Sequence, residues 1–135
     1  MKSKLITFVG GYIVLFATNF LVYGVLLAGS YEAMMARNPS AFLDEPNMAM
    51  MFAVLAVQTL LMVTLLSRMN VAALKDGFVA GAWINMGIIA IANGFNLASL
   101  SLFTMQEAAV DVLISGVLGG IAGAVIAYLL ARFDG

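Results

Sequence analysis

The chain has neither cysteine nor histidine among its 135 residues. Without cysteine it has no disulfide, no thiolate metal site and no cysteine nucleophile. Without histidine it lacks the commonest metal ligand, the commonest haem ligand and the commonest general base. Because these absences remove the usual groups for acid–base and nucleophilic chemistry, we expect no enzymatic activity and no cofactor.

Charge is also scarce. Charged residues make up 10% of the chain, whereas hydrophobic residues make up 64%. A soluble domain carries about 25% charged residues, because its surface must be hydrated. The formal net charge of −1 and only six Lys and Arg residues provide no basic surface for a nucleic acid. The composition therefore predicts an integral membrane protein whose surroundings are a lipid bilayer.

Four long apolar runs carry no charged residue. They lie at residues 5–28, 48–67, 77–100 and 112–131. Each can cross the hydrocarbon core as a helix, because about 20 residues suffice at a rise of about 1.5 Å per residue. The first run is too long for the core of a signal peptide and no lipidated cysteine follows it, so we expect it to be retained.

The connections between these runs are short except at residues 29–46, so neighbouring helices should be antiparallel. We predict an all-α polytopic membrane protein, a single domain over residues 1–135 built as a bundle of four transmembrane helices. The helices are expected at about residues 5–36, 46–67, 75–100 and 105–132.

Three loop motifs predict where helices begin and end. Asn38-Pro39 should end the first helix, because the residue before proline is pushed out of the α region. Asp44-Glu45-Pro46 should start the second, with acidic side chains at the positive end of the helix dipole. Thr104 and Glu107 have the spacing of a capping box, which predicts a helix start near Met105.

The basic residues are distributed unevenly between the two sides of the predicted bundle. One side carries five of them: Lys2, Lys4, Arg68, Lys75 and Arg132. The other side carries Arg37 alone, together with most of the acidic residues. Because basic residues concentrate in cytoplasmic loops, we expect a bacterial cytoplasmic (inner) membrane protein with both termini in the cytoplasm.

Small residues recur at the spacing that lets membrane helices approach closely. The glycines concerned are Gly77, Gly81, Gly116, Gly119, Gly120 and Gly123. Two interpretations remain open. These glycines pack helices together within one chain, or those of the last helix form a contact between protomers of a homo-oligomer.

Polar side chains interrupt the third apolar run. At about 100° per residue, Asn85 and Asn96 lie about 20° apart on one helix face, with Trp83 on the opposite face. An amide left unpaired in hydrocarbon costs roughly 2–7 kcal/mol, so this face should point toward protein. Partners are expected at similar depth on the other helices. The full polar set is Asn19, Gln58, Asn85, Asn93, Asn96, Asp111 and Ser115.

This polar set again has two interpretations. As interhelical hydrogen bonds, each contact would contribute about 0.6 kcal/mol. As a functional site, the groups would line a pocket or pathway, because polar residues inside a membrane usually mark one. In the second case we expect Asn19, Asn93, Asn96, Asp111 and Ser115 to form a polar site that opens to the outer side.

Ten methionines suggest a further alternative. Thioethers are soft ligands suited to Cu(I), and Met48, Met50 and Met51 are closely spaced. Methionine also fills apolar gaps, and neither histidine nor cysteine supports a metal site here. We therefore expect no bound metal.

Several stretches resemble a bacterial family of predicted four-helix membrane proteins, a domain of unknown function. They are Gly77-Phe-Val-Ala-Gly81, Gly94-Phe-Asn-Leu-Ala-Ser-Leu100 and Val110-Asp111, with a looser likeness over residues 5–65. Acidic residues expected from the family in helices one and three are Asn19 and Asn96 here. The resemblance implies the fold and no activity.

Two functions of different class follow from these patterns. The first is a small transport or permeation unit, homo-oligomeric because four short helices rarely enclose a pathway, for a small polar solute that passes an asparagine-lined interior. The second is a structural or accessory subunit that docks on a larger membrane complex.

Overall fold

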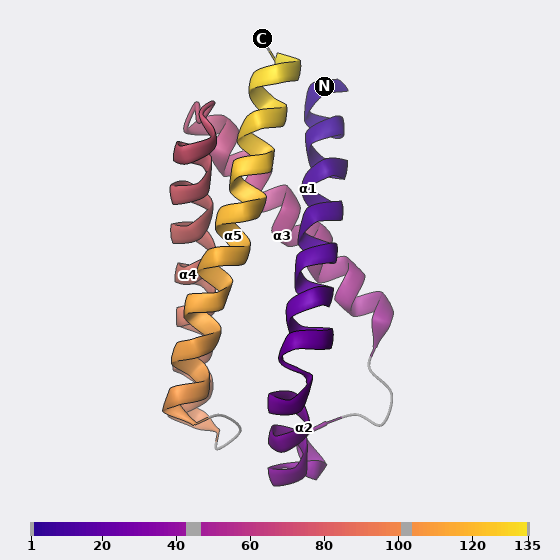
Figure 1. The fold of residues 1–135 in the computed structure, drawn as a ribbon, viewed down its shortest axis with the longest axis vertical. Helices are drawn as coiled ribbons and strands as arrows, with labels where there is room; N and C mark the ends of the chain where they lie inside the picture. Colours follow the sequence, from indigo (N-terminus) through magenta and orange to yellow (C-terminus); the bar gives the residue numbers. More distant parts are fainter. Residues whose placement is uncertain (1, 43–46, 101–103, 135) are drawn as a thin grey trace.

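The computed structural model describes residues 2–42, 47–100 and 104–134, and all regular structure in these ranges is helical (Figure 1). The elements are α1 (Lys2–Leu21), the π-helical turn η1 (Val22–Leu26), α2 (Ala28–Arg37), the 3-10 turn η2 (Pro39–Ala41), α3 (Met48–Arg68), α4 (Leu74–Ser99) and α5 (Met105–Asp134). Four helical stretches are long and apolar enough to cross a membrane: Lys2–Leu26, Met48–Arg68, Leu74–Ser99 and Met105–Phe133. The all-α prediction is confirmed.

The helix ends follow local sequence signals. At the start of α5, the Thr104 amide donates to Glu107 Oε1 (2.9 Å) and the Glu107 amide donates to Thr104 Oγ1 (3.1 Å), which confirms the capping box. The first helical region ends at Arg37, directly before Asn38-Pro39, as predicted. The predicted start signal at residues 44–46 lies outside the described residues. The side chain of Asn47 caps α3 by accepting from the Met50 amide (3.0 Å).

The turn between α3 and α4 depends on Asn70, whose φ of 55° lies in the left-handed region that asparagine tolerates. The Val71 amide donates back to the Leu66 carbonyl (3.2 Å), and the Asn70 amide to the Ser67 carbonyl (3.2 Å). These are the two bonds of a Schellman cap, which satisfies carbonyls that the ending helix leaves free. The chain therefore reverses within a few residues, and α4 runs back beside α5.

The first helical region is not the continuous helix expected over residues 5–36. In η1 the Leu27 amide donates to the Val22 carbonyl (2.7 Å), five residues earlier, instead of four. Leu27 then leaves the α region with φ −105° and ψ 13°, and α2 starts afresh at Ala28. A π-helical turn inserts an extra residue, so it changes the direction in which the following side chains point.

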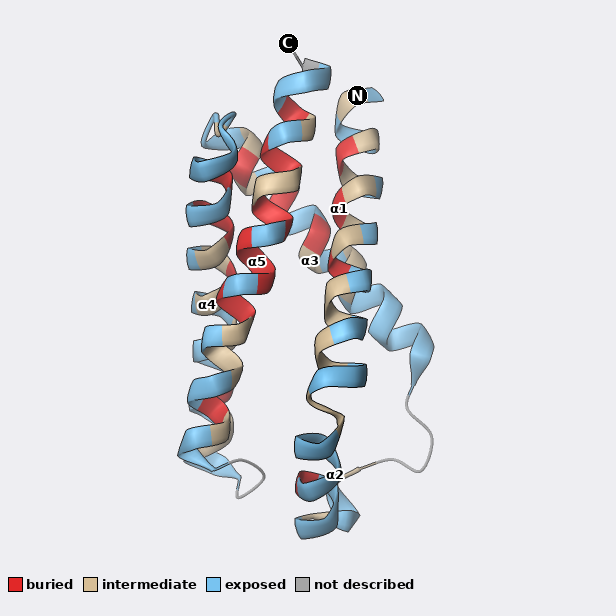
Figure 2. Cartoon of the chain, viewed as in Figure 1, coloured by how far each residue is buried: buried red, intermediate tan, exposed pale blue. Residues whose placement is uncertain are grey.

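Helix α5 lies between α4 and α1, and α3 crosses behind it (Figure 1). Buried residues are concentrated along α5, whereas α1, α3 and α4 each expose a wide apolar face (Figure 2). The main buried cluster comprises Leu15, Met62, Val63, Leu66, Ala80, Ala122, Ile126 and Leu130. The two termini lie at the same end of the molecule, and α2 lies at the other end (Figure 1).

All six glycines singled out in the sequence lie at the contact between α4 and α5. A Cβ atom placed on Gly77 would lie 2.5 Å from the Gly123 carbonyl oxygen, and one on Gly119 would lie 2.5 Å from that of Gly81. Gly116 and Gly120 face the side chains of Met86 and Phe78. The glycines thus pack helices within one chain. The glycine-rich face of α5, which could also have contacted a second protomer, is covered by α4.

Candidate functional site

Asn85 lies at the centre of one polar cluster. Gln58 donates from Nε2 to Asn85 Oδ1 (2.6 Å), and Asn85 donates from Nδ2 to the carbonyl oxygen of Ser115 (2.7 Å). As the helical spacing predicts, Asn85 is only 3% exposed whereas Trp83 is 73% exposed. These two hydrogen bonds join α3, α4 and α5, and they pair both the oxygen and the nitrogen of the Asn85 side-chain amide. Its geometry is that of an interhelical hydrogen-bond bridge.

A second polar cluster forms around Asp111, two turns of α4 away. Asn93, which is 6% exposed, donates from Nδ2 to Asp111 Oδ2 (2.8 Å) and also approaches the Ala108 carbonyl oxygen (3.3 Å). Tyr23 donates its hydroxyl hydrogen to Asp111 Oδ1 (2.6 Å). The carboxylate is thus held by one donor from η1 and one from α4. Because each oxygen accepts one hydrogen bond, the orientation of the Asp111 carboxylate is fixed.

The other members of the expected polar set lie apart from Asp111. Asn19 donates from Nδ2 to the Leu15 carbonyl oxygen of its own helix (2.7 Å), a local bond available to a short amide side chain. The Ser115 hydroxyl donates to the Val112 carbonyl oxygen (2.7 Å), so Ser115 meets Asn85 through its backbone alone. Asn96 is half-buried and makes no side-chain hydrogen bond within the described residues. The expected single site therefore divides into the Asn85 and Asp111 clusters.

Tyr23 was absent from the sequence prediction, although it completes the grip on Asp111. Its position depends on η1, because the π-helical turn changes the side-chain directions at this end of the first span. The Tyr31 ring meets the Tyr23 ring edge-on, with centroids 6.5 Å apart and planes at 83°. The sequence feature that could have indicated Tyr23 is the pair of tyrosines near the end of the first apolar run. A tyrosine combines an apolar ring with a hydroxyl group that needs a hydrogen-bond partner when buried.

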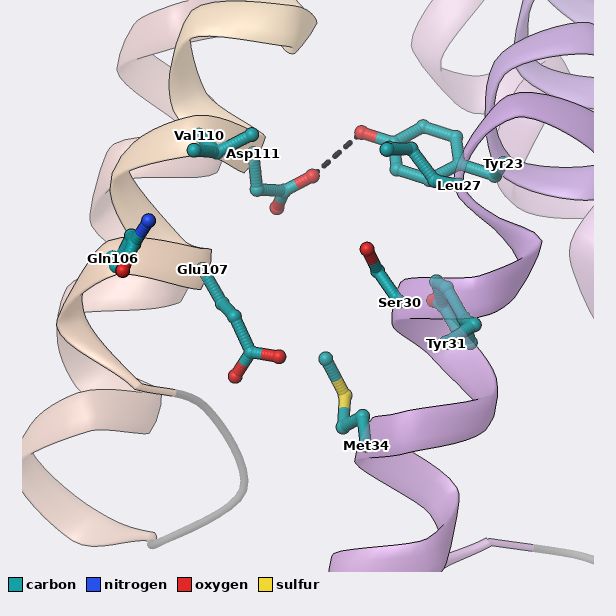
Figure 3. A pocket seen from close by; sticks show the side chains of 9 residues that line it. All are labelled: Tyr23, Leu27, Ser30, Tyr31, Met34, Gln106, Glu107, Val110 and Asp111. Atoms are coloured by element: carbon teal, nitrogen blue, oxygen red, sulfur yellow. Dashed lines mark hydrogen bonds between the residues drawn. The ribbon is translucent and has the colours of Figure 1, made fainter.

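A cavity of about 240 Å³ opens beside Asp111, between η1 and α2 on one side and the first turns of α5 on the other (Figure 3). Its lining comprises Tyr23, Leu27, Ser30, Tyr31, Met34, Gln106, Glu107, Val110 and Asp111. Figure 3 shows the carboxyl groups of Asp111 and Glu107 projecting from α5 toward the side chains of η1 and α2. The cavity is thus walled mainly by apolar groups, with acidic groups on one side.

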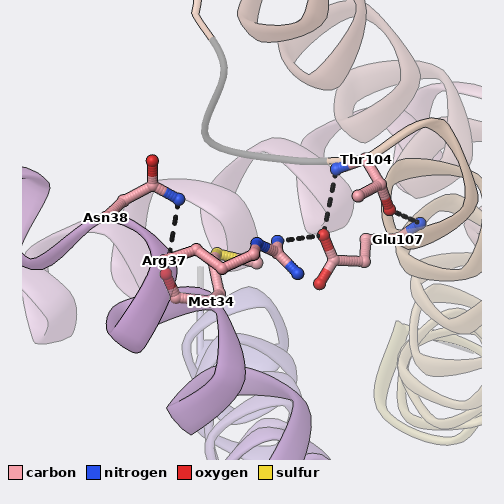
Figure 4. A network of polar contacts seen from close by, with 5 residues as sticks. All are labelled: Met34, Arg37, Asn38, Thr104 and Glu107. Carbon is pink, nitrogen blue, oxygen red and sulfur yellow. Dashed lines mark hydrogen bonds and ion pairs between the residues drawn. The ribbon is translucent and has the colours of Figure 1, made fainter.

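Glu107 and Asp111 differ in whether a positively charged side chain pairs with the carboxylate. Glu107 forms an ion pair with Arg37 (2.5 Å), which reaches across from the end of α2 (Figure 4). Among the described residues, no cationic group pairs with Asp111. Partial burial raises the pKa of Tyr31 above its usual value, and the negative charge of Asp111 raises it further. Tyr31 therefore remains a neutral phenol at physiological pH, and the cavity carries one uncompensated negative charge, that of Asp111.

The three methionines of the metal alternative do not all share one face of α3. Met48, Met50 and Met51 all lie exposed in the first turn of α3. Residues two positions apart on a helix do not face each other, so Met50 points away from Met48. Within the ranges that the structure describes, no three His, Cys, Asp or Glu side chains gather as a metal ion would require.

These features define a small multi-pass helical membrane protein with a cavity, lined by acidic groups on one side, at the end opposite its termini. Comparison of the chain with family models, curated proteins and solved structures finds no match. The functional proposals therefore depend on the residues of this chain.

Proposed function

We propose that the protein is a transport or permeation unit for a small polar solute, and that the cavity beside Asp111 is where the solute binds. The observation that carries this proposal is the Asp111 carboxylate, held by Tyr23 and Asn93 at the edge of a cavity of about 240 Å³. Intramembrane polar residues that pair with one another usually mark a solute pathway. A carboxylate needed only for helix packing would not require an adjacent cavity.

The solute path would continue outside a single chain. Inside the chain, the contact between α4 and α5 is filled by glycine backbones, and Asn85 is bonded on both sides. The wide apolar faces of α1, α3 and α4 are free to meet further copies. We therefore propose a homo-oligomer in which neighbouring copies enclose the path.

The proposed location is a bacterial inner membrane with both termini in the cytoplasm, because Lys and Arg are concentrated at the end that holds the termini. The cavity would then face the outer side. The absence of native cysteine allows a direct test. A cysteine at Ser40 should react with a membrane-impermeant thiol reagent in intact cells, and one at Ser3 should react only after lysis. The reverse pattern would contradict this orientation.

Reconstitution tests the transport proposal. Liposomes with the purified protein should take up at least one class of small solute faster than empty liposomes, when neutral, cationic and anionic solutes are compared by stopped-flow light scattering. Asp111→Asn should remove this difference, whereas Glu32→Gln, an exposed acid on α2 outside the cavity lining, should preserve it. Uptake equal to that of empty liposomes for all three classes would contradict the proposal. We also propose no catalysis, which solute turnover by the purified protein would overturn.

A second candidate is an accessory subunit of a larger membrane complex. It is favoured by the first half of α3, where residues 48–54 are all exposed (Figure 2). Within this stretch Phe52 stacks on Phe16 of α1. Purification in mild detergent separates the two functions. A symmetric homo-oligomer supports transport, and stoichiometric co-purification of unrelated membrane subunits supports the accessory function.

A further inference from the structure

We infer that the cavity beside Asp111 selects a small monovalent organic cation, an ammonium group attached to a short apolar body. This inference rests on the proposed function, because it names the class of solute that the cavity would take. It draws on the charge, the free acceptor positions, the apolar lining and the size of the cavity.

The charge of the cavity determines the sign and the valence of the ligand. Arg37 compensates Glu107, so Asp111 supplies the one remaining charge among the lining residues. Asp111 is half-buried, and burying a carboxylate costs less when a positive charge accompanies it. A ligand with a single positive charge neutralises the cavity, whereas an anion would add a second uncompensated charge.

Asp111 retains acceptor capacity for such a ligand. An ionised carboxylate has about four acceptor positions, and two of them are occupied by the Tyr23 hydroxyl and the Asn93 amide. Both donors are neutral, so they orient the carboxylate without cancelling its charge. The remaining positions are available to the N–H donors of an ammonium group. Hydrogen bonds of this charge-assisted kind are roughly twice as strong as neutral ones.

The rest of the lining suits a hydrocarbon body. Leu27, Met34 and Val110 are apolar, and the rings of Tyr23 and Tyr31 extend this apolar surface beside the neutral polar side chains of Ser30 and Gln106. Aromatic faces attract a cation within about 6 Å of the ring centre. A bare Ca²⁺ ion needs about six to eight oxygen ligands, usually several carboxylates, and within the described residues no third acidic side chain gathers with Asp111 and Glu107. The cavity volume of about 240 Å³ is below that of pockets for drug-sized molecules, so the ligand is small.

Binding measured by isothermal titration calorimetry on the full-length protein in nanodiscs tests the inference. The probes are n-butylammonium, neutral 1-butanol, anionic butyrate and sodium ion, each also titrated into empty nanodiscs. We expect saturable binding of butylammonium alone. Asp111→Asn should weaken it about tenfold or more, as expected for loss of a charge-assisted hydrogen bond. The matched control Glu32→Gln should change it less than about twofold.

Tyr31→Leu provides a second test in case the Asp111 variant does not fold. The donors to the Asp111 carboxylate are Tyr23 and Asn93, so this substitution leaves both hydrogen bonds in place. Loss of one aromatic face should weaken butylammonium binding about two- to fivefold. Equal binding of butanol and butylammonium, displacement by millimolar sodium, or no saturable binding of any probe would each overturn the ligand class. Butylammonium binding without uptake into liposomes would support the ligand class and overturn transport. Uptake of a neutral solute without ammonium binding would do the opposite.

Discussion

Asn85 and Asn93 lie on the same helix, two turns apart, and both are almost fully buried, yet they have different surroundings. Asn85 is bonded to an amide and a backbone carbonyl between three packed helices. Asn93 is bonded to a carboxylate that lines a cavity. The comparison shows that burial of an asparagine does not by itself distinguish a bond within packed protein from a bond beside a cavity. The distinction comes from the charge of its partner and the space beside that partner.

The largest expected effect concerns the tight region around Asn85. Gly119→Ala places a Cβ against the backbone of Gly81 and the side chain of Asn85, so α4 and α5 must separate. We expect a loss of about 3 kcal/mol or more of unfolding free energy, at the upper range for overpacking. Equilibrium unfolding in mixed micelles measures it. The control is Gly87→Ala, where nothing lies within 4 Å, and it should be neutral or slightly stabilising.

Next in size is the loss of the Asn85 bridge. Asn85→Leu removes two interhelical hydrogen bonds and leaves Gln58 without its acceptor. The unfolding free energy should fall by about 1–2 kcal/mol in the same assay. Butylammonium binding should remain within about twofold of the original, because the bridge lies outside the cavity lining. A selective loss of binding with unchanged stability would make Asn85 part of the site.

The complementary variant is Asn93→Leu. It removes one of the two donors that orient Asp111. Leucine suits a membrane helix, so the unfolding free energy should fall by about 0.6 kcal/mol. Butylammonium affinity should fall about three- to tenfold, because the carboxylate loses its fixed orientation. Calorimetric titration of both variants checks that Asn93→Leu lowers butylammonium affinity more than Asn85→Leu does. Identical behaviour of the two variants would remove the proposed contrast.

The smallest effect on stability is expected at the mouth of the cavity. Arg37→Gln frees Glu107, and because Arg37 is 44% exposed the stability cost should be about 0–1 kcal/mol. The cavity would then carry two negative charges in place of one. We expect 1,3-diaminopropane to gain affinity relative to butylammonium, measured by competition titration. An unchanged ratio of the two affinities would show that Arg37 does not determine the charge of the cavity.

The amino-acid sequence by itself determined the class of the fold and much of its local structure. Uncharged runs long enough to span hydrocarbon predict helices, because a backbone in lipid must satisfy its own hydrogen bonds. Thr104 and Glu107 marked the start of α5, and the 100° spacing placed Trp83 opposite Asn85. These features depend on residues close in sequence, so periodicity and local chemistry suffice to predict them.

Only the tertiary structure decided which polar and small residues meet. Asn19 and Asn96 have the same chemistry as Asn93, yet Asn19 bonds its own backbone and Asp111 is held by Asn93 together with Tyr23. The π-helical turn at Val22–Leu26 redirects the chain there, and no residue pattern had predicted it. Likewise, the glycine spacing was compatible with two partners, and the packing of α4 against α5 selected one. A cavity is the space left between helices, so its position depends on side-chain directions that a one-dimensional pattern does not contain.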